Sequence, residues 1–149
     1  MEKVICSNRK AYYEYEILET LEAGIQLLGT EVKSLRTNQV SLNDSFAQIK
    51  NNEAFMINAN IAQYSFGNRV NHEPTRTRKL LLHKTEIARL LGKTKEKGLT
   101  LIPLKLYFKS GKAKVELGLG KGKKVHDKRE SIKKKINDRE IGRAMKHYR

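Results

Sequence analysis

The sequence predicts a small, mainly β domain, an antiparallel barrel with flanking helices, followed by a basic C-terminal tail. Three observations predict it. Apolar and polar residues alternate in several short segments separated by turn residues, as in strands with one buried face. One longer segment with helical periodicity lies between them. The last 29 residues carry 12 Lys and Arg against 4 Asp and Glu, with few apolar residues to form a core.

The residue pattern in the N-terminal third of the chain predicts a strand pair and a short helix. Apolar residues alternate with polar ones over residues 13–21, and a second apolar run follows Gly24 at residues 25–28, which predicts two paired strands. Thr30 is then expected to cap a brief helix that ends near Arg36.

Two hairpins are predicted further along the chain. The first spans residues 46–57 with Asn51 and Asn52 at its turn, because Asn tolerates the positive φ of a tight turn. The second spans residues 102–119 and turns at Ser110-Gly111, with one apolar face along both strands.

The remaining elements complete a barrel. Residues 83–97 predict a helix that stops at Gly98, and residues 61–64 predict one more strand. Pro103 cannot donate a ladder hydrogen bond, so we expect it near a strand start or on an edge. About six short antiparallel strands with one good helix indicate a small closed barrel of the oligonucleotide-binding kind.

The charge of the chain points to a polyanionic partner. The formal net charge is +15, of which +8 falls within residues 121–149. Lys and Arg that neutralise phosphates gain affinity by releasing counterions, so nucleic acid is the favoured partner class. A membrane surface is disfavoured, because no basic amphipathic helix presents an apolar face. The lack of a long apolar run and the lone Cys6 lead us to expect a cytoplasmic protein.

The tail has charge but no continuous apolar stripe. At ~100° per residue, Val125, Ile132 and Ile136 share one helical face, whereas Ile141 and Met145 fall on the opposite side. We therefore expect the tail to be disordered when free and helical when a partner neutralises its charges. The alternative is a solvated basic tail that only aids solubility.

Two basic clusters lie in the body of the chain. Arg76, Arg78 and Lys79 lie in a polar loop, and in an extended chain the two arginines would point to one side, which suits two successive phosphates. The alternative is a structural loop whose arginines cap carbonyls or pair with glutamates. Asn8-Arg9-Lys10 forms a smaller cluster, with ordinary surface charge as its alternative.

Motifs for catalysis and metal binding fail on their spacing. Gly92-Lys93-Thr94 lacks the earlier glycine of a phosphate-binding loop, since Ile87 occupies that position. His72-Glu73 lacks the second histidine of a zinc helix, because Arg76 occupies that position. With one Cys and four His, we expect no metal site, no cofactor and no enzymatic activity.

Several blocks resemble a known family. They are Asn8-Arg9-Lys10-Ala11, Glu22-Ala23-Gly24-Ile25, Gly29 to Arg36, Asp44-Ser45, Pro74 to Leu82, and Gly120 to Lys124 with Asp127-Lys128-Arg129. In this order and spacing the chain resembles the small protein B family, the SsrA-binding proteins that partner transfer-messenger RNA in bacterial ribosome rescue.

The resemblance implies a function and a division of the chain. Family members bind the tRNA-like domain of transfer-messenger RNA and help elongation factor Tu deliver it to stalled ribosomes. The tail acts in the empty mRNA channel, next to the ribosomal RNA of the decoding region. We therefore expect an RNA-binding barrel over residues 1–120 and a ribosome-binding tail over residues 121–149.

The expected contact residues come from the family match and from charge. By matched position, the resemblance places Asn8, Arg9, Glu22, Leu81, His83 and Lys114 against the RNA and Lys124, His126, Asp127, Lys128 and Arg129 in the ribosome-facing tail. Charge adds Lys10, Arg76, Arg78 and Lys79 to the first set and Lys121, Lys123, Lys133, Lys134 and Lys135 to the second. The alternative function is a structural ribosomal protein or a translation-factor-like barrel that binds ribosomal RNA, since basic barrels with tails serve both roles.

Overall fold

A long antiparallel hairpin forms the central part of the sheet. The computed structural model describes residues 2–64, 71–96 and 98–123. Strands β8 (Thr100–Lys109) and β9 (Lys112–Gly122) pair along nearly their whole length. They turn at Ser110 and Gly111, both with positive φ, at 52° and 77°. The predicted second hairpin is therefore confirmed.

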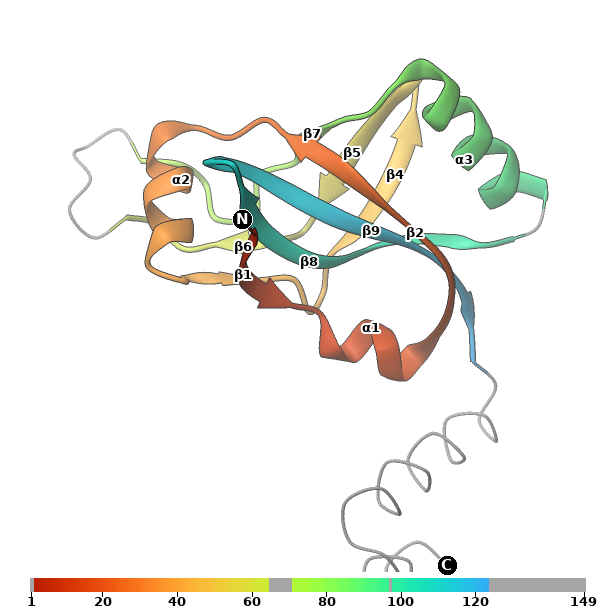
Figure 1. The fold of residues 1–149 in the computed structure, drawn as a ribbon, viewed down its shortest axis with the longest axis horizontal. Coiled ribbons are helices and arrows are strands. Elements are labelled where there is room, and N and C mark those ends of the chain that lie inside the picture. Colours follow the sequence, from red (N-terminus) through yellow and green to blue (C-terminus); the bar gives the residue numbers. More distant parts are fainter. Residues whose placement is uncertain (1, 65–70, 97, 124–149) are drawn as a thin grey trace, which may run out of the picture.

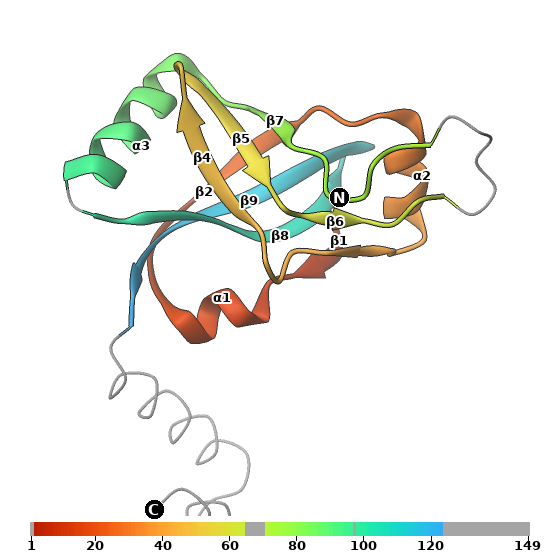
Figure 2. The same ribbon diagram turned by 180° about the vertical axis from the view of Figure 1, so that it is seen from behind.

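The hairpin closes a ring of strands, which Figures 1 and 2 show from opposite sides. The sheet order is β1-β8-β4-β5-β7-β2-β9, and the additional pairing of β8 with β9 closes it. The strands are β1 (Glu2–Ser7), β2 (Tyr15–Ile25), β4 (Phe46–Lys50), β5 (Glu53–Ile57) and β7 (Arg78–Leu81). With β1 added outside the ring, the result is the predicted small antiparallel barrel of the oligonucleotide-binding type.

Within the part of the chain that the structure describes, three helices flank the barrel. They are α1 (Arg9–Glu14), α2 (Gly29–Arg36) and α3 (Lys84–Glu96), and a short pair of strands, β3 (Val40–Ser41) and β6 (Asn60–Ile61), lies beside α2. Helices α2 and α3 lie at opposite ends of the barrel in Figure 1. The helix α3 confirms the prediction over residues 83–97, with its buried Leu90 facing the core.

The N-terminal elements differ from the prediction. Tyr13 lies in helix α1 rather than in a strand, because the Asn8 side chain accepts a hydrogen bond from the Ala11 N–H and starts a helix there. Period-two alternation begins only at Tyr15. The strand β1 was not predicted, since its residues 2–7 show no clear alternation, and it pairs with the outer edge of β8.

Three local predictions are also wrong. Residues 25–28 do not form a second strand, because β2 continues through Gly24 without a turn and ends at Ile25. The predicted strand at residues 61–64 is reduced to Asn60–Ile61. Thr30 does not cap α2, which begins at Gly29 with the Glu31 carboxylate accepting from the Leu28 N–H at 2.8 Å.

Pro103 lies where β8 changes neighbours. Strand β8 pairs with β4 at Leu101 and with β1 only from Lys105 onwards, and a register shift between Pro103 and Lys105 interrupts its pairing with β9. Pro103 therefore lies near the start of β8, as predicted, between the residues that pair with β4 and those that pair with β1.

The inward faces of the strands form the main apolar core, and Ala11, Ile102 and Leu104 form a second, smaller cluster between α1 and β8. The fully buried members of the main core include residues of five strands and two helices: Ala23, Leu35, Met56, Leu80, Leu90, Leu106, Val115, Leu117 and Leu119. Burial of such side chains contributes about 1.5–3 kcal/mol each and is the main stabilising term of the fold.

A buried ion cluster joins α2 to β7. The Glu31 carboxylate and the Arg78 guanidinium are both fully buried, with 2.6 Å between Oε2 and Nε, and Arg76 reaches the other carboxylate oxygen at 2.6 Å. Arg78 also donates to the carbonyls of Ala59 and Pro74, at 2.9 and 3.0 Å. Every charge in the cluster thus has a partner, as buried charges require.

The electrostatics of the cluster keep the carboxylate ionised. Burial by itself raises the pKa of Glu31, but hydrogen bonds from Arg76 and the Leu28 N–H and the charge of Arg78 outweigh burial and hold this pKa below its usual value. His72 is also buried, and its Nε2 lies 2.7 Å from the Ile61 carbonyl, which can only accept.

Replacement of Arg78 with Met is expected to destabilise the barrel by about 3–5 kcal/mol, because it leaves a buried carboxylate with Arg76 as its one charged partner. The free energy of unfolding in urea measures this loss. The matched control is Lys79→Met, which breaks the exposed 2.9 Å pair with Glu53 and should cost less than about 1 kcal/mol. Equal losses for both variants would contradict a structural role for the buried cluster.

Candidate RNA interface

Three of the predicted RNA-binding residues share the outer face of the barrel. In the ladders, Leu81 on β7 lies opposite Gly24 on β2, and Gly24 lies opposite Lys114 on β9. Glu22, two residues before Gly24, points to the same side because side chains alternate along a strand. We call Glu22, Leu81 and Lys114 the outer-face triad. Leu81 is 46% exposed.

The carboxylate of the triad is held by a tyrosine. The Tyr107 hydroxyl donates to Glu22 Oε2 at 2.6 Å, and Lys109 Nζ lies 3.3 Å from the same oxygen. The hydrogen bond from Tyr107 is the main reason that the pKa of Glu22 is lowered, and the charges of Lys109 and Lys114 add to it. Partial burial and the same hydrogen bond raise the pKa of Tyr107. Glu22 is therefore ionised and fixed, with its second oxygen available to accept from a ribose hydroxyl or a base amine.

A cleft of about 310 Å³ lies next to the triad. It is lined by residues of β2, α2, β7 and the β8–β9 hairpin, including Val32, Leu81, Lys112 and Lys114. Gly24 contributes no side chain to its floor, and a Cβ at that position would lie 3.1 Å from Leu81 Cβ. The glycine therefore keeps the space between Leu81 and Lys114 open.

The N-terminal cluster divides into a structural residue and two surface cations. Asn8 is 1% exposed, and its side chain both accepts from the Ala11 N–H and donates to the Pro103 carbonyl at 2.9 Å. We therefore correct the prediction for Asn8, whose side chain caps α1 and ties it to β8. Arg9 and Lys10 are exposed, and Lys10 pairs with Asp44 at 3.2 Å.

The loop arginines follow the structural alternative. Arg78 has no exposed surface and donates to Glu31 and to several carbonyls, so it cannot meet a phosphate, and we correct the prediction for this residue. Arg76 also binds Glu31 and retains 33% exposure of its side chain. Lys79 is 41% exposed and pairs with Glu53. Both arginines do point to one side, as period-two spacing predicts, but that side faces the buried Glu31.

The other predicted residues lie apart from one another. His83 is exposed just before α3, two residues beyond Leu81, and its N–H donates to Glu86. Lys121 is exposed at the end of β9, and the Lys123 N–H donates to the Glu14 carbonyl at 2.9 Å, which places the end of the described chain beside α1. The remaining tail predictions lie outside the described residues: Lys124, His126, Asp127, Lys128, Arg129, Lys133, Lys134 and Lys135.

Gly24, Tyr107 and Lys109 also belong to this site, but sequence patterns do not predict them. Gly24 between two apolar runs favours a turn, although its position directly after Glu22-Ala23 in a matched block is a usable signal. Tyr107 alternates with apolar residues and lies 85 positions from Glu22, so only the pairing of strands brings the two together.

Other chemistries find little support in the described part of the chain. Among residues 2–64, 71–96 and 98–123, no group of three or more His, Cys, Asp and Glu could hold a metal ion. None of the helices in those ranges is both long enough and apolar enough to cross a membrane.

The barrel, the outer-face triad and the excess of cations define a basic nucleic-acid-binding barrel protein. Residues 5–147 match the family described as "SmpB protein", and the chain belongs to this family, whose members are RNA-binding proteins and not enzymes.

Relatives and a solved structure agree with the family match. The chain is 62% identical over 146 residues to the SsrA-binding protein of Carboxydothermus hydrogenoformans, with 98% of each chain covered. It is 61% identical to that of Desulforudis audaxviator, with 97% of this chain and 95% of the relative covered. A solved structure described as "tmRNA-SmpB: a journey to the center of the bacterial ribosome" contains a similar chain, with 53% identity and a TM-score of 0.68 over 91% of this chain and 95% of that chain.

Replacement of Tyr107 with Phe is expected to raise the pKa of Glu22, because the carboxylate loses its strongest hydrogen bond. A carbon-detected NMR titration of the Glu22 carboxyl measures the change. Since a lowered pKa contributes stability above the unfolded pKa that is lost as pH falls, the variant should also lose less stability than the parent on acidification. Tyr12→Phe is the matched control and should leave the Glu22 titration unchanged; an unchanged pKa in Tyr107→Phe would disprove the holding role.

Proposed function

We propose that the protein binds the tRNA-like domain of transfer-messenger RNA through its outer-face triad and acts in trans-translation. The observation that carries the proposal is the convergence of Glu22, Leu81 and Lys114 on one exposed face from three separate strands. The names of the relatives, SsrA-binding protein, and the tmRNA-SmpB structure support it.

The chemistry of the triad suits a folded RNA corner. Lys114 supplies a cation for a phosphate, Glu22 an acceptor for a ribose hydroxyl or base amine, and Leu81 an apolar surface for an unstacked base. Because all three lie on paired strands, their spacing is fixed before the RNA arrives. Binding then costs little conformational entropy on the protein side.

We further propose that residues 121–149 serve the ribosome. In this proposal the complex reaches stalled ribosomes in the cytoplasm with elongation factor Tu, and the tail enters the empty mRNA channel and contacts ribosomal RNA of the decoding region. Three features support the proposal: the +8 charge of this segment, its scattered apolar residues, and the matched block Asp127-Lys128-Arg129. Ordering of the tail costs conformational entropy that counterion release offsets.

Replacement of Lys114 or Glu22 with Ala is expected to weaken binding to the isolated tRNA-like domain by about 1–3 kcal/mol, the usual effect of losing one specific contact. Fluorescence anisotropy at fixed salt measures the affinity. Lys50→Ala, at an exposed position on β4 away from the triad, removes the same charge and should have a much smaller effect. If Lys50→Ala and Lys114→Ala lose the same affinity, binding depends on general charge and the triad is not the site.

Deletion of Asp127 to Arg149 is expected to separate binding from tagging. It removes none of the strand residues that build the barrel, so affinity for the tRNA-like domain should remain, while peptide tagging on stalled ribosomes in a reconstituted system should stop.

His126→Ala in the full chain should slow tagging without altering RNA affinity, because a stacked ring contributes roughly 1–3 kcal/mol per base. Full-rate tagging by the truncated protein would overturn the proposed role of the tail.

The RNA that copurifies with the protein distinguishes the alternative function. A single transfer-messenger RNA species supports ribosome rescue. Fixed stoichiometry in every ribosomal subunit would support a structural ribosomal protein instead.

A further inference from the structure

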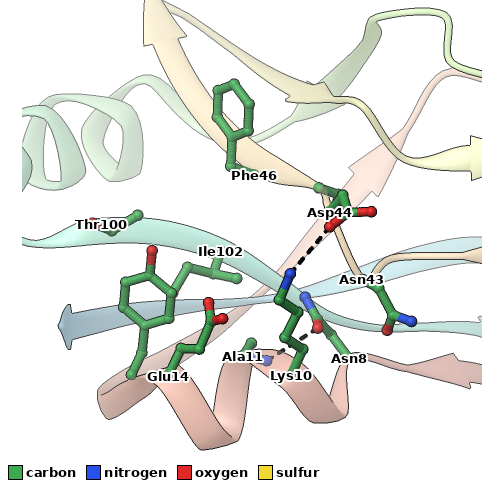
Figure 3. Close-up of a pocket in the computed structure, with 11 residues that line it drawn as sticks. Asn8, Lys10, Ala11, Glu14, Asn43, Asp44, Phe46, Thr100 and Ile102 are labelled. Atoms are coloured by element: carbon green, nitrogen blue, oxygen red, sulfur yellow. Dashed lines mark hydrogen bonds and ion pairs between the residues drawn. The ribbon is translucent and has the colours of Figure 1, made fainter. Parts of the chain in front are cut away.

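The seam of the barrel between β4 and β8 is weakly paired. Within these described strands, the ladder consists of a single pair, Ala47 with Leu101. A regular antiparallel ladder would continue with Phe46 opposite Ile102. Instead, these two residues line a cleft of about 350 Å³ between β4, β8 and helix α1. Figure 3 shows the cleft, with Phe46 and Asp44 on one side and α1 on the other.

The cleft combines an apolar interior with a polar rim. Tyr15, Phe46 and Ile102 form much of its apolar surface, and Phe46 is 42% exposed. The polar lining side chains come from three parts of the chain: Asn8, Lys10 and Glu14 at α1, Asn43, Asp44 and Ser45 before β4, and Thr100 on β8. An exposed aromatic ring beside several polar groups is the usual composition of a small-ligand site.

A ligand can replace the ion pair between Lys10 and Asp44 that crosses the cleft. Lys10 Nζ lies 3.2 Å from Asp44 Oδ1, and the two side chains are 50% and 74% exposed. An ion pair this exposed contributes about 0–1 kcal/mol, so a ligand that offers each group a better partner can replace it. Lys10 suits a phosphate, whereas Asp44 suits a group with neighbouring N–H donors.

We propose that this cleft takes one unstacked guanine nucleotide of single-stranded RNA. The base lies against the Phe46 ring, since every base has a face that stacks on aromatic side chains. Guanine is the RNA base whose Watson–Crick edge carries two adjacent N–H donors, which match the two carboxylate oxygens of Asp44. The phosphate of the nucleotide pairs with Lys10. The Glu14 carboxylate accepts from a ribose hydroxyl, and the Thr100 hydroxyl donates to or accepts from another.

This site is independent of the outer-face triad. In the ring order β8-β4-β5-β7-β2-β9, the β4–β8 seam lies opposite the β7–β2 seam that carries Leu81. A protein that holds the tRNA-like domain by its triad would therefore still present this cleft to a second RNA strand.

The test is an NMR titration of the nitrogen-15-labelled full chain with the RNA pentamers UUGUU, UUAUU and UUUUU, with guanosine 5′-monophosphate, and with inorganic phosphate. UUGUU should shift the amides of Asn43, Asp44, Phe46 and Thr100 saturably, and should bind at least about fivefold more tightly than the other pentamers. Phe46→Leu keeps an apolar side chain without a ring and should lose at least about fivefold in affinity for UUGUU. Tyr12→Leu, at a 50% exposed ring outside the cleft lining, should change nothing.

A second pair of variants tests the base edge. Asp44→Asn should abolish the preference for guanine over adenine, and Glu16→Gln, at an exposed carboxyl outside the cleft, should retain it. Three results would overturn the proposal: no saturable shifts at the cleft, equal binding of inorganic phosphate there, or tighter binding of the free mononucleotide than of UUGUU. Affinity for the tRNA-like domain, measured on the same variants, should be unaffected and so remains a separate test of the proposed function.

Discussion

The ion cluster of Glu31, Arg76 and Arg78 fixes the arrangement on which the rest of the barrel depends. A buried carboxylate is unfavourable unless its charge is matched, so α2 must lie where the two guanidinium groups can reach it. Arg78 is also the first residue of β7, and its contacts with the carbonyls of Ala59 and Pro74 hold the chain before that strand. The register of β7 with β2 then follows, and with it the position of Leu81.

The outer-face triad uses this fixed register. Its members are far apart in the chain and come from strands whose inward neighbours are fully buried, so none of them can move without disturbing the core. The hydrogen bond from Tyr107 holds the Glu22 side chain in one position, and Gly24 keeps the space between Leu81 and Lys114 open. The cations of the chain therefore have two distinct uses. Arg78 stabilises the fold from inside, whereas Lys114 presents its charge outside.

The open β4–β8 seam follows from the same architecture. Strand β8 pairs with β9 along nearly its whole length and also pairs with β4 and β1. Pro103 lies between the residues of β8 that pair with β4 and those that pair with β1. Asn8 ties α1 to the Pro103 carbonyl, so the helix covers this gap without filling it. The end of the described chain also lies beside α1, through the hydrogen bond from Lys123 to Glu14. This weakly paired part of the ring thus lies next to the start of the tail.

The sequence by itself determined the elements with strong local signals. Alternation over residues 102–119, the Asn51-Asn52 and Ser110-Gly111 turns and the period of α3 all follow from local geometry, and the charge of the tail is a matter of counting. Family blocks located Glu22, Leu81 and Lys114, but not the tyrosine that holds Glu22. Tertiary structure alone decided that Arg78 faces a buried carboxylate and that Asn8 caps a helix, because a polar side chain before folding is equally compatible with solvent, phosphate or a distant partner. Those choices depend on contacts between residues that the chain brings together only when the barrel closes.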